Sequence, residues 1–373
     1  LERSTRQLPV IVADDGSEAD IGAVVQASPL DVTLVRQEHD GNGAARARNL
    51  GAAAAGEVDV VIFIDSDCIP HPDLVANHLR WHAGPTDVVT IGTRRHVRVA
   101  DVEVTAIASG RADLEERVQA GFSGRPDFRQ VLGRRTARLT TGDEGFRTFV
   151  SSNVAVPRHL FERVGGFADR FPHWGAEDTE LGWRLWQEGA FFVPVEDAVV
   201  YHQLDEDEEG GYEGRSVARR LNDGTLATLV PHGFYRKPRR DVIYEVPKVS
   251  LVVHHPSADL EDLWVDVVGQ TAPDLELILV GADQTHQPML GLRPTDGLLT
   301  HRGIHAAVRS APNLPVGGRR RLGRLALGRR PAARHRGSTS GLGQVGPDRT
   351  GQGVVGHPGM GPSRPSGPGL GLD

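Results

Sequence analysis

Short apolar segments alternate with helix-forming segments between Leu8 and His202, and this alternation restricts the chain to an α/β architecture. The first apolar segments are short and rich in β-branched residues, which is typical of buried strands: 8–13, 32–35, 58–64 and 88–92. Between them, 44–55 and 72–82 favour helices. The pattern predicts a mainly parallel sheet flanked by helices.

The pattern resumes after a polar, weakly periodic stretch at 102–138. Strands are expected at 149–156 and 191–201, and helices at 158–164 and 177–188. These elements complete a first domain, which we place at 1–235.

A second α/β unit is expected after a boundary rich in Lys, Pro and Arg, which we place as a linker at 236–247. Strand signals at 249–253 and 276–280 flank a helical segment at 259–268. We therefore place the start of this second unit at 248–290.

The last segment, 291–373, has a different composition, with 13 Arg, no Lys, 3 Asp, 19 Gly, 9 Pro and no aromatic residue. Such a segment buries too little apolar surface to offset its ordering entropy, so we expect disorder. An out-of-frame translation product is the other interpretation, because 40 Arg against two Lys in the chain suggest a GC-rich gene. The arginines are not interleaved with aromatic residues, so binding of RNA or acidic lipid is less favoured.

Charge and cysteine usage exclude further classes. The first 290 residues carry 29 basic and 46 acidic side chains, which argues against a nucleic-acid partner. Cys68 is the single cysteine, so neither a disulfide framework nor a cysteine-based zinc site is expected. No run approaches about 18 apolar residues, so no integral membrane segment is expected. Without a basic-then-apolar leader, we expect a cytoplasmic location, or one peripheral to a membrane.

Acids or a histidine follow three of the expected strands, where α/β sheets bind ligands. Asp14 and Asp15 follow the first strand, Asp65-Ser66-Asp67 follows 58–64, and His202 follows 191–201. A single such acid is more often a helix cap, but three strand ends together favour a site. Alternate residues of an extended segment point the same way, so Asp65 and Asp67 can address one cation. Carboxylate oxygens suit Mg²⁺ or Mn²⁺.

Five segments in this order carry a family resemblance: VIVADDGSEAD, ARARNLGAAAAGEVDVVIFIDSDCIP, SSNVAVPRHLFERVGGF, WGAEDTELGWRL and VVYH. Together they resemble a family 2 glycosyltransferase of the GT-A fold, over about residues 8–202. The WGAED segment further resembles the branch with chondroitin-polymerase-like and polypeptide N-acetylgalactosaminyltransferase-like enzymes. The resemblance implies metal-dependent, inverting transfer of a sugar from a nucleotide-sugar donor, a UDP-sugar, to a hydroxyl of a glycan or other acceptor.

The resemblance also implies roles for individual residues. For the donor it implies contacts with Asp15, Arg48 (or Arg46), Asn49, Asp65 and Asn153. For the metal it implies Asp67 and His202 as ligands, with Mn²⁺ favoured over Mg²⁺ because of the imidazole.

At the acceptor, the resemblance implies Asp178 as the general base, Glu177 beside it and Trp174 stacked on a sugar ring. An inverting transfer needs a base for the acceptor proton and a cation for the departing diphosphate. The helix dipole alone also favours acids at Glu177 and Asp178. Other candidates receive structural interpretations: His78 and His82 are expected on a surface face, and Cys68 is expected as a packed small residue.

Two departures from the family pattern leave alternatives open. The first strand and helix that usually precede the DDGS strand do not occur before it, which predicts an N-terminally truncated sheet. Residues 247–282 resemble such an opening and start a second module, or alternatively complete the first sheet; Gly281-Ala282-Asp283-Gln284 stands where DDGS is expected. The alternative functions are a non-catalytic nucleotide- or carbohydrate-binding remnant and, less favoured, a nucleotidyltransferase.

Overall fold

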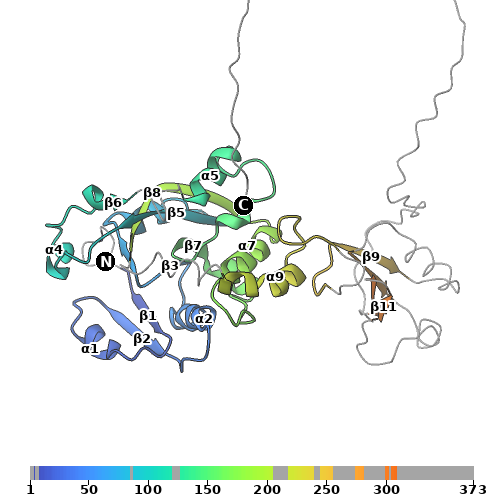
Figure 1. The fold of residues 1–373 in the computed structure, drawn as a ribbon, viewed down its shortest axis with the longest axis horizontal. Helices are drawn as coiled ribbons and strands as arrows, with labels where there is room; N and C mark the ends of the chain where they lie inside the picture. Colours follow the sequence, from blue (N-terminus) through green and yellow to red (C-terminus); the bar gives the residue numbers. More distant parts are fainter. Residues whose placement is uncertain are drawn as a thin grey trace, which may run out of the picture. The chain divides into compact units, whose positions relative to one another are not determined.

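The computed structural model describes residues 4, 8–84, 87–119, 127–204, 217–238, 244–254, 274–280, 299–301 and 304–308 (Figure 1). It divides into Leu1–Arg320 and Arg321–Asp373, and the second unit lies wholly outside the described residues. The helix expected at 259–268 and the turn at 281–284 also lie outside them. None of the described helices is long and apolar enough to cross a membrane.

The N-terminal elements form a small parallel ribbon packed on a helix. β1 (Val10–Asp14) pairs in parallel with β2 (Val32–Arg36), and α1 (Ile21–Gln26) connects them. α2 (Ala44–Ala54) follows, and its buried residues are alanines. Small side chains let α2 approach β1 closely: a Cβ at Gly51 would lie 3.2 Å from the Cβ of Ala13. This ribbon places the end of β1 beside the start of α2.

The main sheet has six strands in the order β3-β7-β5-β8-β4, with the short β6 on β5. Their bounds are β3 (Val60–Ile64), β4 (Cys68–Pro70), β5 (Val88–Val97), β6 (Val118–Gln119), β7 (Asn153–Pro157) and β8 (Phe191–Gln203). The predicted α/β class is confirmed, but the strand directions are mixed. Only β5 and β8 pair in parallel, whereas β3–β7, β5–β7, β4–β8 and β5–β6 are antiparallel. The alternation of strands and helices along the chain does not specify which strands are neighbours in the sheet. β7 lies between β3 and β5 and runs antiparallel to both.

The helices and turns around this sheet are α3 (Leu74–Leu79), α4 (Val104–Ala108), η1 (Glu115–Arg117), α5 (Phe128–Arg135), η3 (Gly145–Thr148), α6 (Arg158–Arg163), α7 (Glu177–Gln187) and α9 (Asp223–Leu229). The largest core cluster joins Val154 and Val156 of β7 to Leu181 and Leu185 of α7. Gly182 lets α7 approach η3, because a Cβ there would lie 2.5 Å from the Phe146 carbonyl oxygen.

A separate four-stranded sheet follows. It contains β9 (Val249–His254), β10 (Leu275–Val280), β11 (Leu299–His301) and β12 (Ile304–Val308) in the order β11-β12-β10-β9. β9 and β10, the two strands expected here, pair in parallel, and β12 joins β10 in parallel. β11 and β12 fall within the segment whose composition predicts disorder.

Candidate active site

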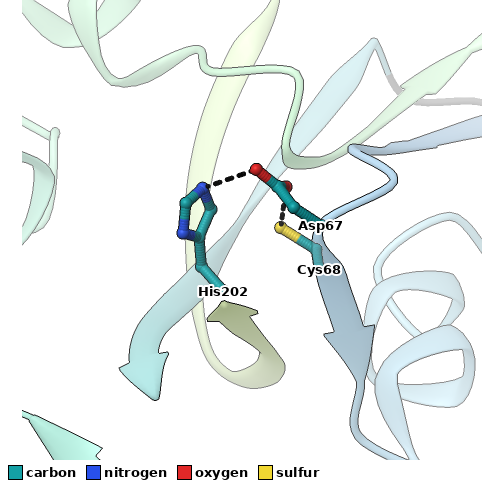
Figure 2. A group of neighbouring side chains, drawn as sticks. All are labelled: Asp67, Cys68 and His202. Carbon is teal, nitrogen blue, oxygen red and sulfur yellow. Dashed lines mark hydrogen bonds and ion pairs between the residues drawn. The ribbon is translucent and has the colours of Figure 1, made fainter. Parts of the chain in front are cut away.

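Asp67, Cys68 and His202 form a compact cluster at the edge of the main sheet (Figure 2). β4 runs antiparallel to β8, which sets Cys68 directly opposite His202. His202 Nε2 lies 3.1 Å from Asp67 Oδ2, and the Cys68 thiol lies 3.5 Å from Asp67 Oδ1. The three potential ligand atoms all lie within 4.8 Å of one another. One oxygen, one nitrogen and one sulfur donor can therefore address a single cation.

Electrostatics make Asp67 the anionic member of this cluster. Burial opposes its charge, but the hydrogen bond and the electrostatic interaction with His202 lower the pKa of the Asp67 carboxyl. Burial and the charges of Asp67 and Asp65 raise the pKa of the Cys68 thiol, which keeps it protonated. Asp67 remains 49% exposed, whereas His202 and Cys68 are buried. An incoming ligand would therefore approach from the Asp67 side.

Arg48 joins a second cluster of acids. This residue of α2 places its Nη2 2.9 Å from Asp65 Oδ1 and its Nη1 3.2 Å from Glu177 Oε1. Burial opposes the charge, but the carboxylates of Asp178, Asp65 and Glu177 together raise the pKa of the guanidinium. Three elements thus meet here: α2, the turn after β3, and the start of α7.

Asp178 is the unusual acid of this cluster. Burial raises its pKa to about 7, the negative charge of Glu177 adds to this, and Arg48 opposes it. Its Oδ1 is shielded from water and has no hydrogen-bond partner among the described residues. A carboxyl in this state exchanges a proton near neutral pH, as a general base must.

The loop before α7 holds these acids in place. Gly175 and Ala176 both adopt left-handed backbone angles, with φ of 85° and 87°. The buried Asn222 donates from Nδ2 to the carbonyls of His173 at 2.8 Å and Gly175 at 2.6 Å. Asn42, just before α2, donates to the same His173 carbonyl at 2.8 Å. Amides from two sides therefore fix this loop where α7 begins.

Trp174 lies in the same loop and is 53% exposed, so its indole is open to a ligand from solvent. Asp15 lies at the end of β1, where its carboxylate contacts Gln37 Nε2 at 2.6 Å and His39 Nδ1 at 3.0 Å. Gly43 permits this placement, because a Cβ there would lie 1.9 Å from Asp15 Oδ1. Asp15 is thus beside the start of the helix that carries Arg48.

The structure does not bring Asn49 or Asn153 to the site. Both polar atoms of the Asn49 side chain bond the backbone of Phe167, each at 2.8 Å. Asn153 is fully buried, and its Nδ2 donates to the carbonyls of Thr93 and Ala198 at 3.0 and 2.9 Å. Both amides therefore bond groups of the fold rather than residues of the two clusters.

The surface position predicted for His78 is wrong. Its side chain is 0% exposed, with Nδ1 2.7 Å from the Thr90 hydroxyl and Nε2 2.8 Å from Asn153 Oδ1. Burial lowers the pKa of His78 to about 4, so the ring is neutral at pH 7. Two polar partners make burial of this histidine possible. His82, four residues later, is less enclosed and contacts the same Thr90 hydroxyl at 3.3 Å.

Sequence reasoning missed three residues of the site. The sequence predicts Cys68 as a packed small residue, although its thiol also lies within reach of the cation position. His96 of β5 packs its ring against His202, with centroids 5.2 Å apart, because β5 and β8 pair in register there. Asn222 clamps the loop before α7 from more than forty residues downstream. Only the position of Cys68 beside Asp67 carried any local signal.

Comparison with known proteins identifies a family signature. Residues 1–149 match the model of glycosyl transferase family 2, and residues 135–199 match that of the N-terminal domain of galactosyltransferase. Residues 1–149 thus carry the sequence signature of glycosyltransferase family 2. The two matched ranges together contain every residue of the clusters described above except His202 and Asn222.

Relatives of this chain include two polysaccharide synthases from Pasteurella multocida. A chondroitin synthase is 29% identical over 76% of this chain and 31% of its own length. A hyaluronan synthase is 30% identical over 74% of this chain and 30% of its own length. The chain thus spans about a third of the length of these relatives. A probable N-acetylgalactosaminyltransferase from Caenorhabditis elegans is 24% identical over 61% of this chain and 37% of its own length.

Solved structures that resemble this chain share little sequence with it. A mannosyltransferase from Pyrobaculum calidifontis, in complex with GDP-Man and Mn²⁺, is 21% identical, with a TM-score of 0.38 over 56% of this chain and 51% of that one. Staphylococcus aureus TarS in complex with UDP-GlcNAc is 16% identical, with a TM-score of 0.38 over 61% and 65%.

Proposed function

We propose that this chain transfers a sugar from a nucleotide-sugar donor, a UDP-sugar, to an acceptor hydroxyl with inversion at the anomeric carbon, and that the reaction depends on a divalent cation. The observation that carries the proposal is the pairing of the Asp67 carboxylate with the His202 imidazole, 3.1 Å apart at the edge of the sheet. The family 2 signature of residues 1–149 and relatives that are sugar-polymer synthases support it.

Asp67 and His202 would hold the cation, with Mn²⁺ favoured and Mg²⁺ as the alternative. The mixed oxygen and nitrogen donor set fits Mn²⁺ better than Mg²⁺, which prefers oxygen ligands and water. When bound, the cation supplies positive charge against the diphosphate of the leaving nucleotide. Cys68 adjoins the same position, and its protonated thiol is a weak ligand.

Asp178 would take the proton of the acceptor. The acceptor oxygen forms a bond to the anomeric carbon, the bond from that carbon to the diphosphate oxygen breaks, and the acceptor proton moves to Asp178. A carboxyl with its pKa raised to about 7 is a stronger base than an ordinary aspartate yet is still half ionised at neutral pH. Glu177, paired with Arg48, would hold the guanidinium in place beside Asp178.

Donor and acceptor contacts are proposed at three places. Asp15 would accept hydrogen bonds from the nucleoside, and Arg48 with Asp65 would lie against the ribose and the phosphates. Trp174 would stack on an acceptor sugar, because its indole is half-exposed beside the start of α7.

Release of UDP from a panel of UDP-sugars, with mixed oligosaccharides as acceptors and Mn²⁺ present, tests this function. Wild type is expected to release UDP, and Asp178→Asn is expected to lose about 10²–10⁴-fold in rate while keeping UDP affinity. Asp169→Asn, an acid on the preceding loop with no role in the site, is the matched control. Transfer by Asp178→Asn at the wild-type rate would contradict the assignment of the base.

A further inference from the structure

A cavity of about 430 Å³ lies between β5, residues Pro194–Glu196 of β8, where the bulge at 196–198 begins, and the segment around α5. Its volume is that of a pocket for a small molecule. None of the residues proposed above for the metal, donor or acceptor lines it. Five arginines do: Arg94, Arg95, Arg129, Arg134 and Arg138. The first 290 residues carry more acidic than basic side chains, so five arginines around one cavity are unusual for this part of the chain.

Two of these arginines share a single carboxylate. Arg129 Nη2 lies 2.7 Å from Asp127 Oδ2, and Arg94 Nε lies 3.8 Å from the same oxygen. The Arg129 side chain is only 5% exposed, so its charge is poorly solvated. Burial and the neighbouring charge of Arg129 lower the pKa of Arg94, a sign of uncompensated positive charge. One negative and two positive charges leave this wall of the cavity cationic.

The same two guanidinium groups have unused donors. Arg129 Nη1 and Arg94 Nε are shielded from water and have no hydrogen-bond partner among the described residues. A buried donor without a partner is unfavourable, more so when charged, unless a ligand or ion satisfies it. The hydrogen bonding of this pair is therefore incomplete within the described part of the chain.

The rim of the cavity adds charge and backbone strain. Arg134, in the last turn of α5, is exposed, and no ion pair is recorded for it within the described part of the chain. Ala137, Arg138 and Leu139 are consecutive non-glycine residues with φ of 47°, 60° and 67°. This left-handed turn brings Arg138 to the bulge, where its Nη1 contacts Glu196 Oε1 at 2.8 Å. Left-handed non-glycine residues are strained, and they cluster at ligand sites.

We propose that this cavity binds an oxyanion, a phosphate or a carboxylate, carried by a ligand of about the size of a sugar, and that Arg94, Arg129 and Arg134 hold it. Guanidinium groups match both anions through paired, charge-assisted hydrogen bonds. Arg94 and His96 are alternate residues of β5 and lie on one face of the strand, and His96 packs on His202. The oxyanion site therefore adjoins the metal cluster without sharing its residues.

Calorimetric titration of the full chain with three sugars of one ring skeleton tests this site. The probes are glucose 6-phosphate, glucuronate and neutral glucose, so only the group at C6 changes. At least one anionic sugar is expected to bind about tenfold or more tighter than glucose. Binding of one and not the other assigns the anion as phosphate or as carboxylate.

Three variants locate the binding. Arg129→Met and Arg134→Gln are each expected to lower the affinity for the anionic sugar about tenfold. Arg163 is an exposed arginine in the last turn of α6, and Arg163→Gln is expected to leave this affinity unchanged. Arg134 is exposed, so its variant folds even if Arg129→Met does not. Equal affinities for all three sugars, or wild-type affinity in Arg134→Gln, would overturn the proposal. No nucleotide or metal is present, so the result is independent of the proposed transfer reaction.

Discussion

Asp178 is the proposed general base, and its surroundings disfavour the ionised form of its carboxyl group. Burial and the charges of Glu177 and Asp65 raise its pKa, whereas the charge of Arg48 and the side chain of Ser151 lower it. The pKa of Asp178 is thus set by its neighbours rather than by its own chemistry. Changing any of these neighbours should move the pH at which the base is available.

The pH dependence of transfer follows from this balance. Asp178 acts as a base only when ionised, so kcat/KM is expected to rise with pH through about 7. Arg48→Gln removes the positive charge that lowers the Asp178 pKa, and the midpoint of the profile is expected to move to higher pH. Arg46→Gln is the control, because Arg46 lies on the same helix and, among the described residues, its recorded polar contacts are with Asp40 alone. A wild-type profile flat across about pH 5–9, or an unmoved midpoint in Arg48→Gln, would show that Asp178 is not the base.

A second residue-scale effect concerns stability at acid pH. Burial lowers the pKa of His78 to about 4 from an ordinary 6.5, so the unfolded chain binds the proton first. The contribution of neutral His78 to the free energy of unfolding is complete above about pH 6.5. As the pH falls toward 4, this free energy decreases by up to about 3 kcal/mol. Urea midpoints at several pH values should show this loss in wild type and less of it in His78→Gln. The exposed His159→Gln should behave as wild type; an equal loss in His78→Gln would contradict the account.

At the scale of elements, sequence patterns predicted most of what is local. The strands that became β1, β2 and β3, and the helices that became α2, α6 and α7, lie within a few residues of their expected bounds. β5 runs to Val97, although the sequence predicts its end at Gly92. Arg94 and His96 interrupt the apolar pattern on which that prediction depends, yet both residues still pair with β8. The stretch at 102–138 has no clear periodicity, yet it contains α4 and α5.

Close packing of α7 on η3 leads to a prediction at this scale. Gly182→Ala adds a Cβ that would lie 2.5 Å from the Phe146 carbonyl oxygen, so a loss of about 1–3 kcal/mol in unfolding free energy is expected despite the better helix propensity of alanine. Gly133→Ala in α5 is the matched control, because nothing lies within 4 Å of its Cβ position. That variant should gain up to about 1 kcal/mol. Chemical denaturation measures both, and a stabilised Gly182→Ala would contradict the packing described.

At the scale of the whole molecule, the site is built from residues far apart in sequence. Asp67 meets His202 because β4 pairs with β8, and Arg48 meets Glu177 because α2 and α7 begin side by side. Local patterns do not specify such pairings. The strand-end positions of Asp67 and His202 favour one shared site, whereas the contact between Arg48 and Glu177 is not predicted by the sequence. The backbone partners of Asn49 and Asn153 are likewise not visible in the sequence.

The central claim is that Asp67 and His202 hold a cation on which donor binding depends. Calorimetric titration of UDP into the chain, with and without Mn²⁺, tests it most directly, with Asp67→Asn beside Asp73→Asn. Asp73 is the matched control, because its side chain is also 49% exposed and it lies outside the cluster. The account predicts that UDP binds only with Mn²⁺, that Asp67→Asn abolishes this binding and that Asp73→Asn preserves it. Equal binding of UDP without Mn²⁺, or to Asp67→Asn, would contradict it.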